Sequence, residues 1–350
     1  MKTYYAIGLM SGTSLDGVDL VYVKFEVTNT YSYKILFAET IPYSSKWKQK
    51  LKDAFHFDAE SLNRLSIEYA NLLSELIIGF IDKNNIDDID FIASHGHTIH
   101  HQPEKGYTLQ IGDGKTIYKQ TKIKTICDFR TQDVQLGGQG APLVPVGDAF
   151  LFHQYDYCLN LGGFANISLD DAGKRIAYDI CPVNIVLNHY VNQLKKEYDD
   201  RGNIAKSGNI HFDLLQELNA LSFYSSEQPK SLGYEFVVAK IFPMINKYDL
   251  PVSDILRTYV EHVAMQIANK MIQKKSVLIT GGGAFNDFLI HRITELSKAN
   301  IIIPDAVTID FKEALIFAFL GLRKIENKIN CLQSVTGAKK DHCSGVVFPS

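Results

Sequence analysis

The stretch YYAIGLMSGTSLDGVDLVYVKF, residues 4–25, predicts two β-strands joined by a tight turn. Residues 4–11 and 18–25 are apolar and rich in aromatic and β-branched side chains, which favour strands. The intervening GTSLDG contains two glycines, and glycine permits the backbone angles that a sharp turn needs. A third strand is expected at 35–40, and apolar residues at helical spacing predict a helix over 60–82.

The same order of elements begins again near residue 157. The stretch YCLNLGGFANISL, residues 157–169, predicts a strand, a glycine turn and a returning strand. A strand at 176–179 and a helix with apolar residues from Val183 to Leu194 follow. Both halves therefore begin with strand, glycine turn, strand, strand and helix, which indicates an α/β protein with an internal structural duplication.

Length and local composition suggest where the halves divide. A chain of 350 residues fits two domains at roughly 150 residues each. Glycine and proline cluster in GGQGAP, residues 137–142, which predicts the boundary there. Farther along, we expect a long helix from Pro251, a buried strand at 276–280 and a last helix over 311–324.

Composition excludes several classes of protein. The chain is 46% hydrophobic and 21% charged with a net charge of −3, values of a globular protein without a basic surface for nucleic acid or anionic membrane. Five cysteines form no C-x-x-C pair, as expected in a reducing compartment. The longest apolar run, residues 314–322, is far shorter than the ~18 residues of a membrane span, and no signal-peptide pattern is present. We therefore expect a cytoplasmic protein.

Three glycine-rich turns are candidates for binding phosphate or nucleotide. They are residues 11–17, 161–166 and 280–286. Glycine lets backbone N–H groups approach a phosphate, although each turn alone is also an ordinary hairpin or loop. None matches G-x-G-x-x-G or G-x-x-x-x-G-K-[ST], so neither the dinucleotide fingerprint nor the Walker loop is met.

Two further groups carry side chains suited to chemistry. Asp179 ends a predicted strand and is placed either for general-base catalysis or to cap the next helix. Four histidines lie in HGHTIHH, residues 95–101, where His95 and His97 share a face of the strand. This spacing suits metal ligands or polar substrate contacts, but Ile99 stands where the H-x-H-x-D-H pattern of metallo-hydrolases has its Asp.

Together these residues resemble one known family. The most specific motif is GLMSGTSLDGVD at residues 8–19. Further matching pieces, in chain order, are SHG at 94–96 with Thr98, LQIGD at 109–113, DFR at 128–130 with Asp133, GGQGAPLVP at 137–145, NLGG at 160–163 with Asn166 and Ile167, PKSLG at 229–233, GGG at 281–283 with Asn286, KEA at 312–314 and TGA at 336–338. The chain resembles the 1,6-anhydro-N-acetylmuramic acid kinase family, of the actin, sugar-kinase and heat-shock-chaperone superfamily.

The resemblance implies a fold and a reaction. The fold is two duplicated RNase H-like domains with an interdomain cleft: residues 1–136, completed by 311–350, and residues 137–310. The reaction, part of cell-wall recycling, uses ATP and Mg²⁺. Water opens the 1,6-anhydro ring of the sugar and the freed O6 takes the γ-phosphoryl group, giving N-acetylmuramic acid 6-phosphate. The implied partner is a small sugar, with neither nucleic acid nor membrane, and the family's tendency suggests a homodimer.

The resemblance also implies roles for individual residues. Asp179 is the general base, and Glu313 helps to orient the water. His95, Arg130 and Asp133 lie near the sugar, with Arg130 suited to a carboxylate. Asp16 or Asp19 positions Mg²⁺. The nucleotide is held by Ser11, Gly12, Thr13, Ser14, Leu15, Asp16, Gly17, Val18 and Asp19, by Gly162, Gly163 and Asn166, and by Gly281, Gly282, Gly283 and Asn286.

The chain departs from the family pattern after its predicted base. The family usually continues with Thr-Gly-Pro-Gly-Asn, whereas residues 180–184 are Ile-Cys-Pro-Val-Asn, and His97 replaces a family glutamine. Cys181 and Val183 in place of glycines could narrow the sugar pocket or rearrange the loop. The alternatives are therefore a kinase for another anhydro sugar such as levoglucosan, a non-catalytic protein that binds nucleotide or muropeptide, and, last, a metallo-hydrolase.

Overall fold

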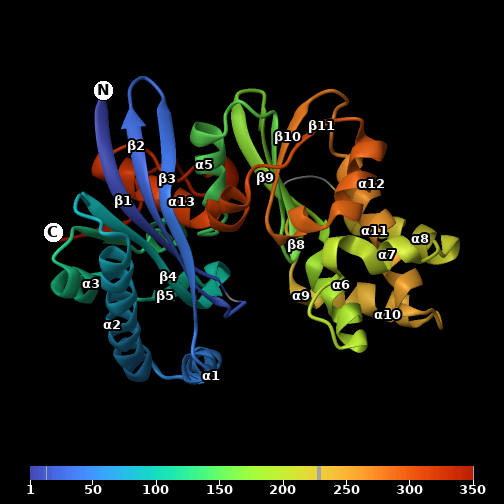
Figure 1. Ribbon diagram of the computed structural model, residues 1–350, viewed down its shortest axis with the longest axis horizontal. Helices are drawn as coiled ribbons and strands as arrows, with labels where there is room; N and C mark the ends of the chain where they lie inside the picture. The colour runs from blue at the N-terminus through green and yellow to red at the C-terminus, as the bar shows by residue number, and fades with distance from the viewer. Residues whose placement is uncertain (13, 227–229, 350) are drawn as a thin grey trace. The chain divides into compact units, whose positions relative to one another are not determined.

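The computed structural model describes residues 1–12, 14–226 and 230–349 (Figure 1). The chain folds as two units, Met1–Phe152 with Phe311–Ser350, and His153–Asp310. We call them the first unit and the second unit, and describe each by itself.

The first unit is built on a sheet that mixes antiparallel and parallel strands. Its seven described strands run in the order β12-β6-β4-β1-β2-β3, with β5 paired to β4. β1, β2 and β3 form an antiparallel meander, while β4 is parallel to β1 and β6 is parallel to β4. The strands are β1 (Lys2–Ser11), β2 (Gly17–Val27), β3 (Tyr31–Pro42), β4 (Phe91–Gln102), β5 (Tyr107–Ile111), β6 (Thr125–Cys127) and β12 (Val346–Phe348).

Helices cover both faces of this sheet. The helices of the unit are α1 (Ser45–Asp53), α2 (Ala59–Asn84), α3 (Gly114–Thr121), α4 (Thr131–Gln135), α5 (Val144–Leu151), α13 (Ala306–Ile325), which begins in the second unit, and α14 (Gln333–Thr336). Alternate residues of a strand face opposite sides, so Ile7 and Leu9 of β1 pack in one core with α2. Gly8 faces α13, where a Cβ atom would collide with Ala314. The motif glycine is thus required by the close approach of α13 to β1.

The second unit repeats the strand order of the first. Its described strands run β11-β10-β7-β8-β9, with an antiparallel β7–β8–β9 meander and β10 and β11 added in parallel. The strands are β7 (Tyr157–Leu161), β8 (Phe164–Asp171), β9 (Lys174–Pro182), β10 (Ser276–Thr280) and β11 (Asn300–Ile302). The helices are α6 (Asn184–Val191), α7 (Asn203–Ser207), α8 (Phe212–Asn219), α9 (Tyr234–Phe236), α10 (Phe242–Asn246), α11 (Val252–Ala268) and α12 (Asp287–Ser297).

Both sheets therefore have the strand order 3-2-1-4-5 when each unit is numbered from its own first strand; β5 and β12 are additions in the first unit. This is the arrangement of the RNase H-like fold, and the predicted α/β class with duplicated domains is confirmed. In the second unit the core is formed by alternate residues of β7 and one face of α11, with Leu159, Leu161, Tyr259 and Val263 all buried.

The predicted boundary at residues 136–137 is wrong. The structure assigns α4, α5 and the intervening glycine-rich segment to the first unit, which extends to Phe152 before residue 311 resumes it. The reason is hydrogen bonding by the buried α4 carboxylate. Asp133 Oδ2 accepts from Gly140 N (2.7 Å), and Gln139 N donates to Thr336 O (2.8 Å). A segment tied down at both points is not a linker, despite its composition.

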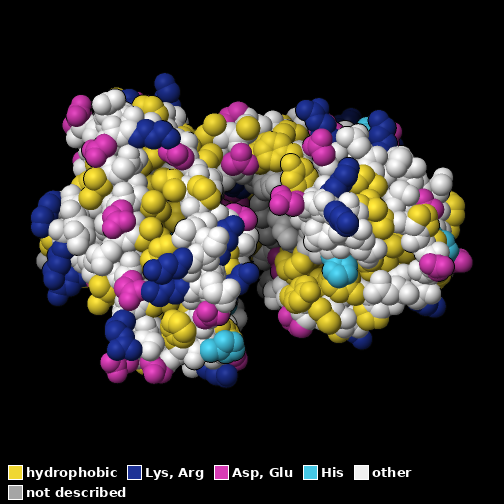
Figure 2. All heavy atoms as spheres, turned by 60° about the horizontal axis from the view of Figure 1, so that its bottom comes forward, with side chains coloured by type: hydrophobic (Ala, Val, Ile, Leu, Met, Phe, Trp, Pro, Cys, Tyr) yellow, Lys and Arg dark blue, Asp and Glu magenta, His cyan; other side chains and the backbone are white. Residues whose placement is uncertain are grey.

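Short strands were the elements that sequence patterns missed. β5, β11 and β12 were not expected, and each contains at most five residues, too few for a periodicity to stand out. No helix of the described residues is long and apolar enough to cross a membrane. On the face shown in Figure 2, basic and acidic side chains are interspersed over each unit.

Candidate active site

The turn between β1 and β2 places small and hydroxyl residues at one end of the first sheet. Leu15 N donates to Gly12 O (3.3 Å), and Leu15 has a left-handed φ of 62°. Gly17 lies so close to the backbone of Ile41 in β3 that a Cβ atom would overlap it. Thr13 lies outside the described residues. The described part of the loop is thus held by its flanks, while Ser14 and Asp16 are exposed.

Ser11 ends β1 in a buried chain of hydroxyl groups. Its Oγ lies 2.6 Å from Tyr43 Oη and 2.8 Å from His97 Nδ1, and Tyr43 Oη lies 2.5 Å from Tyr69 Oη. Burial lowers the pKa of His97 to about 4, so the ring is neutral at pH 7. The chain fixes the end of β1 from three other elements, and sequence reasoning missed both tyrosines because aromatic residues in apolar patterns are usually core residues.

The two acidic residues of this loop differ in their surroundings. Asp19 is half-buried and its Oδ1 accepts from Thr40 Oγ1 of β3 at 2.6 Å. Asp16 is exposed, and its backbone oxygen accepts from Tyr43 N (3.3 Å). The loop therefore offers one oriented carboxylate and one free to turn, both hard oxygen donors of the kind that Mg²⁺ prefers.

His95, within β4, and Arg130, just before α4, form a neutral–cationic pair. Arg130 Nε donates to His95 Nε2 (3.0 Å) and Nη1 donates to Gly140 O (2.6 Å). Since a carbonyl only accepts, the His95 Nδ1–H donates to Gly96 O (3.0 Å), which makes His95 the neutral Nδ1 tautomer. Burial, then the charge of Arg130, hold the pKa of His95 well below its usual value. Two partners orient the guanidinium, and its Nη2 group makes no hydrogen bond to the described residues.

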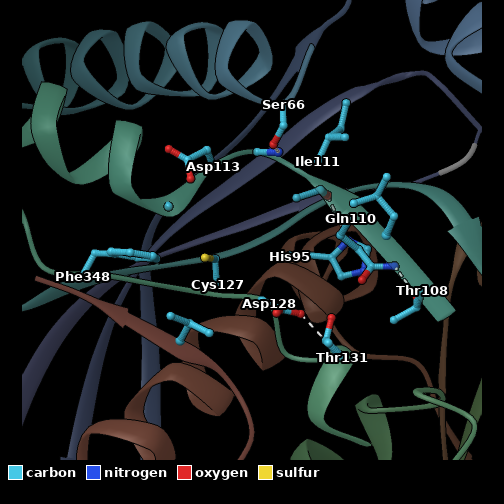
Figure 3. A pocket seen from close by; sticks show the side chains of 15 residues that line it. Ser66, His95, Thr108, Gln110, Ile111, Asp113, Cys127, Asp128, Thr131 and Phe348 are labelled. Carbon is cyan, nitrogen blue, oxygen red and sulfur yellow. Dashed lines mark hydrogen bonds between the residues drawn. The ribbon is translucent and has the colours of Figure 1, made fainter. Parts of the chain in front are cut away.

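A polar cavity of about 250 Å³ opens beside His95 (Figure 3). Its lining comes from β4, β5, the start of α3 and the residues after β6, including Thr108, Gln110, Asp128 and Thr131. Gln110 Nε2 donates to Thr98 and Thr108, whereas its buried Oε1 has no hydrogen-bond partner among the described residues. The wall of the cavity therefore contains a buried acceptor that the described residues leave unsatisfied. The LQIGD motif, residues 109–113, indicated a functional role for this region only through the family resemblance.

Asp133 and Glu313 lie in contrasting environments of the first unit. Asp133 is fully buried, and its carboxylate accepts from Thr336 Oγ1 (2.7 Å), Cys331 Sγ (3.0 Å) and Gly140 N. Glu313 is exposed on α13 and feels the charge of Arg130. Desolvation raises the pKa of Glu313 and Arg130 opposes the shift, but water screens both effects at an exposed side chain.

In the second unit, two of the glycine turns meet. A Cβ atom on Gly281 would come within 2.6 Å of Asn160 Oδ1 and 2.9 Å of the Leu161 backbone, and one on Gly283 within 2.7 Å of Leu161 Cβ. Gly281 also has a left-handed φ of 82°. The ends of β7 and β10 thus form a surface of bare backbone, in which Gly282 and Gly163 are exposed.

The same surface receives the start of α6. Asn184 Nδ2 donates to Leu161 O (3.2 Å), and Val183 N and Asn184 N donate to the carbonyls of Gly163 and Gly162. Asn184 was not singled out, although it is the asparagine that the family keeps after its catalytic loop. Asn286 is mostly buried and caps α12 through Leu289 N (3.0 Å), so its Oδ1 is already used within the unit.

Asp179 lies half-buried on β9, opposite Asn166 of β8. Directly paired residues of antiparallel strands project on the same face, so the carboxylate and the amide are neighbours. Asp179 Oδ2 accepts from Leu232 N (2.8 Å), and Asp179 N donates to Lys230 O (2.9 Å). Desolvation raises the pKa of Asp179 and the Leu232 N–H opposes the shift. One carboxylate oxygen is therefore oriented, in surroundings that strengthen the group as a base. Pro229 of the PKSLG motif lies outside the described residues.

The two residues that replace family glycines point into the protein. Cys181 and Val183 are both fully buried members of the core of the second unit. Between them, Pro182 O accepts from Tyr259 Oη of α11 (3.0 Å). Their side chains thus fill the interior beneath the loop, and the narrowing of a pocket by these atoms is not observed.

The histidines of β4 do not gather as metal ligands. In the part of the chain that the structure describes, the group of His, Cys, Asp or Glu side chains arranged to hold an ion is a different one, Asp133, Cys331 and His342. Both ring nitrogens of His95 and the Nδ1 of His97 are engaged in the hydrogen bonds given above. The interpretation as a metallo-hydrolase therefore has no support in this cluster.

Two RNase H-like units, glycine turns at matching strand ends and an oriented half-buried carboxylate define a phosphotransferase of the sugar-kinase class. Comparison with known proteins narrows this class. The family model described as anhydro-N-acetylmuramic acid kinase matches residues 4–350. The chain is 37% identical to a protein of that name from Mannheimia succiniciproducens, over the full length of both. It is 35% identical to one from Shewanella loihica, again over both full lengths, and 33% identical to one from Photobacterium profundum, over 98% of each.

The chain belongs to the anhydro-N-acetylmuramic acid kinase family. It is accordingly an enzyme, a kinase that uses ATP to phosphorylate a small sugar.

Proposed function

We propose that this chain opens the 1,6-anhydro ring of 1,6-anhydro-N-acetylmuramic acid with water and phosphorylates O6, giving N-acetylmuramic acid 6-phosphate and ADP. The water oxygen bonds to C1 while the C1–O6 bond breaks, and O6 then bonds to the γ-phosphorus of ATP as ADP leaves. The observation that carries the proposal is Asp179, a half-buried carboxylate with one oxygen oriented by Leu232 N and a raised pKa.

Asp179 takes the proton from the attacking water in this proposal. A base must be ionised at working pH yet basic enough to accept a proton, and a carboxylate of raised pKa meets both needs. The Leu232 N–H holds Oδ2, which leaves Oδ1 to face the water. Asn166, paired opposite, supplies an amide that can hydrogen-bond the water or a sugar oxygen.

The nucleotide is assigned to glycine turns of both units. Backbone N–H groups of Gly12, Gly17, Gly162 and Gly163 suit phosphate oxygens. Gly281–Gly283 suits adenosine, because Gly281 and Gly283 pack closely on Asn160 and Leu161 and leave backbone without side chains at the surface. Asp19, oriented by Thr40, and exposed Asp16 are the oxygen donors that fit Mg²⁺. When bound, Mg²⁺ would offset the negative charge of the phosphates.

The sugar is assigned to groups of the first unit as well as to Asp179. Arg130, aimed by His95 and Gly140 O, is suited to the lactyl carboxylate of the substrate. Exposed Glu313 remains the proposed group that orients water. Asp133 is buried inside the unit and contributes to sugar binding by holding the segment around Gly140 in place. The cytoplasm and a homodimer are the location and assembly that we propose with this function.

Product analysis tests the proposal. The protein, MgATP and the anhydro sugar are incubated in H₂¹⁸O, and products are analysed by mass spectrometry. We expect a product heavier by one water and one phosphoryl group, with ¹⁸O at C1. Asp179→Asn should form product at least about 100-fold more slowly, while Asp171→Asn, an exposed change at the β8–β9 turn, should behave as wild type. Phosphorylation of levoglucosan in preference to the muramic sugar, or of neither with ATP still bound, would overturn it.

A further inference from the structure

A buried cluster in the first unit has chemistry that the kinase reaction does not use. Asp133 of α4, Cys331 and His342 are each at most 5% exposed. One oxygen, one sulfur and one ring nitrogen of these residues lie within 4.8 Å of one another, the one such set of three among the described residues. Cys331 is a free thiol. Three different ligand types have therefore converged inside the protein.

The backbone holds two members of the cluster in a fixed relation. Cys331 N donates to His342 O and His342 N donates to Cys331 O, both at 3.1 Å, as an isolated antiparallel bridge. The third member is tied to the same region, because Thr336 Oγ1 donates to Asp133 Oδ1 at 2.7 Å. The backbone bridge and the Thr336 hydroxyl thus hold the three residues together independently of contacts among the three side chains.

The protonation of His342 leaves a lone pair facing a carboxylate. His342 Nδ1 lies 3.1 Å from Lys340 O, and since a carbonyl only accepts, Nδ1 carries the hydrogen. In the neutral ring Nε2 then bears a lone pair, and it has no hydrogen-bond partner among the described residues. Its ionic neighbour is Asp133 Oδ1, 3.5 Å away. Two facing lone pairs in a buried site repel unless a cation, a proton or a metal ion, lies against them.

The donor set and the spacing favour a metal ion. Thiolate, imidazole and carboxylate together are zinc ligands, and tetrahedral zinc spaces such ligands by about 3.3–3.6 Å. His342 Nε2 lies 3.5 Å from Asp133 Oδ1, which is within this range. Cys331 Sγ lies closer, at 3.0 Å, because its thiol donates a hydrogen bond to the same oxygen, and a metal ion would replace that proton. Outer hydrogen bonds match those around bound metals: Nδ1–H of His342 to a carbonyl, and Gly140 N to the other carboxylate oxygen.

We propose that Asp133, Cys331 and His342 bind one zinc ion, which fastens the segment around residue 133 to residues 331–342. The bond formed is coordinate, and the Cys331 proton goes to solvent when the thiolate binds. Asp133 also holds the segment around Gly140 in the proposed function, but metal binding is measured without ATP or sugar, so this proposal stands or falls without that function.

Cobalt(II) and zinc binding by the full chain test the proposal. Chelator-treated protein is titrated with Co²⁺, which reports thiolate ligation by a near-ultraviolet charge-transfer band and tetrahedral geometry by intense visible bands. We expect both at one equivalent, with displacement by one equivalent of Zn²⁺. Binding without the thiolate band, or no binding at equimolar metal, would overturn the site; in the second case a protonated His342 pairs with Asp133 instead.

Variants locate the ion. Cys331→Ser and His342→Gln should each weaken Zn²⁺ binding by roughly 100-fold or more, because each removes a direct ligand. Cys343→Ser is the matched control, because the Cys343 thiol is only half-buried and lies outside the cluster. The affinity of this variant for Zn²⁺ should stay within about twofold of the wild-type value. Circular dichroism checks that each variant folds. If a variant does not fold, the cobalt spectrum of the wild-type protein tests the proposal instead. Unchanged affinity in both folded ligand variants would overturn the proposal.

Discussion

The β1–β2–β3 and β7–β8–β9 meanders have the same topology but carry their acids differently. In the first, Asp19 lies on the second strand and accepts a hydrogen bond from Thr40 directly opposite on the third. In the second, Asp179 lies on the third strand, opposite Asn166, and accepts from the backbone of Leu232. One scaffold thus presents a carboxylate suited to holding a cation and another suited to taking a proton.

The largest expected effect separates these two acids. Asp179→Asn should lower kcat by about 10²–10⁴-fold, because the base is lost while its shape remains. Asp19→Asn should mainly raise KM for MgATP. Steady-state ADP release at varied sugar and varied MgATP measures both. If the two variants lose the same parameter, the assignment of different roles to the two meanders is wrong.

Acidification should remove the base activity of Asp179. Burial raises the pKa of Asp179, and the ionised form is the active base, so kcat/KM should fall as pH falls through that raised pKa, about tenfold per pH unit. A pH–rate profile measures the acidic limb. Leu232→Pro removes the N–H that stabilises the carboxylate and should move the limb to higher pH. A limb at the ordinary pKa of an aspartate would contradict the effect of burial.

Restoring a family glycine tests the loop below Asp179. Val183→Gly should lower the free energy of unfolding by about 3 kcal/mol, because it empties a fully buried position. The ratio of turnover on the muramic sugar to that on levoglucosan should not change, since the side chain faces the core. Val183→Ala, a smaller deletion, serves as control and should lose less. A shift in sugar preference would show that this position shapes the substrate site.

The turn at Gly281 should be more sensitive to substitution than its neighbour. Gly281→Ala should cost about 2 kcal/mol, from a left-handed φ and overlap with Asn160 and Leu161. Gly282→Ala is the control, because the atom nearest to its Cβ would be 3.9 Å away. Denaturant unfolding and ATP affinity measure the difference. Equal losses at both positions would contradict the described packing of β7 against β10.

The smallest effect is expected at the matching turn of the first unit. Ser11→Ala should cost about 1 to 2 kcal/mol, because Tyr43 Oη and His97 Nδ1 lose a buried partner. Ser14→Ala, at an exposed position, should stay within about 0.5 kcal/mol. Thermal unfolding compares the two. A neutral Ser11→Ala would mean that the hydroxyl chain does not stabilise the fold.

Local patterns predicted the elements with long, clear periodicity. The strands of both meanders, the helix at α2 and the helix at α11 were all expected. The two helices show their buried face as apolar residues at helical spacing, and inner strands such as β1 and β2 are apolar runs buried on both faces. The roles proposed for Asp179 and the glycine turns came from the resemblance and await experiment.

Other features depend on contacts that sequence order does not show. The segment at Gly137–Pro142 looks like a linker, yet buried Asp133 fastens it to residues near Thr336, about two hundred positions away in the chain. Likewise, Cys181 and Val183 looked like obstructions of a pocket, and only the direction of their side chains places them in the core. Side-chain direction in an irregular loop is set by tertiary packing.

The return of residues 311–349 to the first unit has a consequence for biosynthesis. The second unit is continuous, His153–Asp310, and is complete in sequence before α13 and β12 have been translated. Until then Gly8 lacks the helix that packs against it, and β6 lacks an antiparallel partner. Because domains generally fold as units during synthesis, the second unit has its whole sequence available for folding before the first unit does.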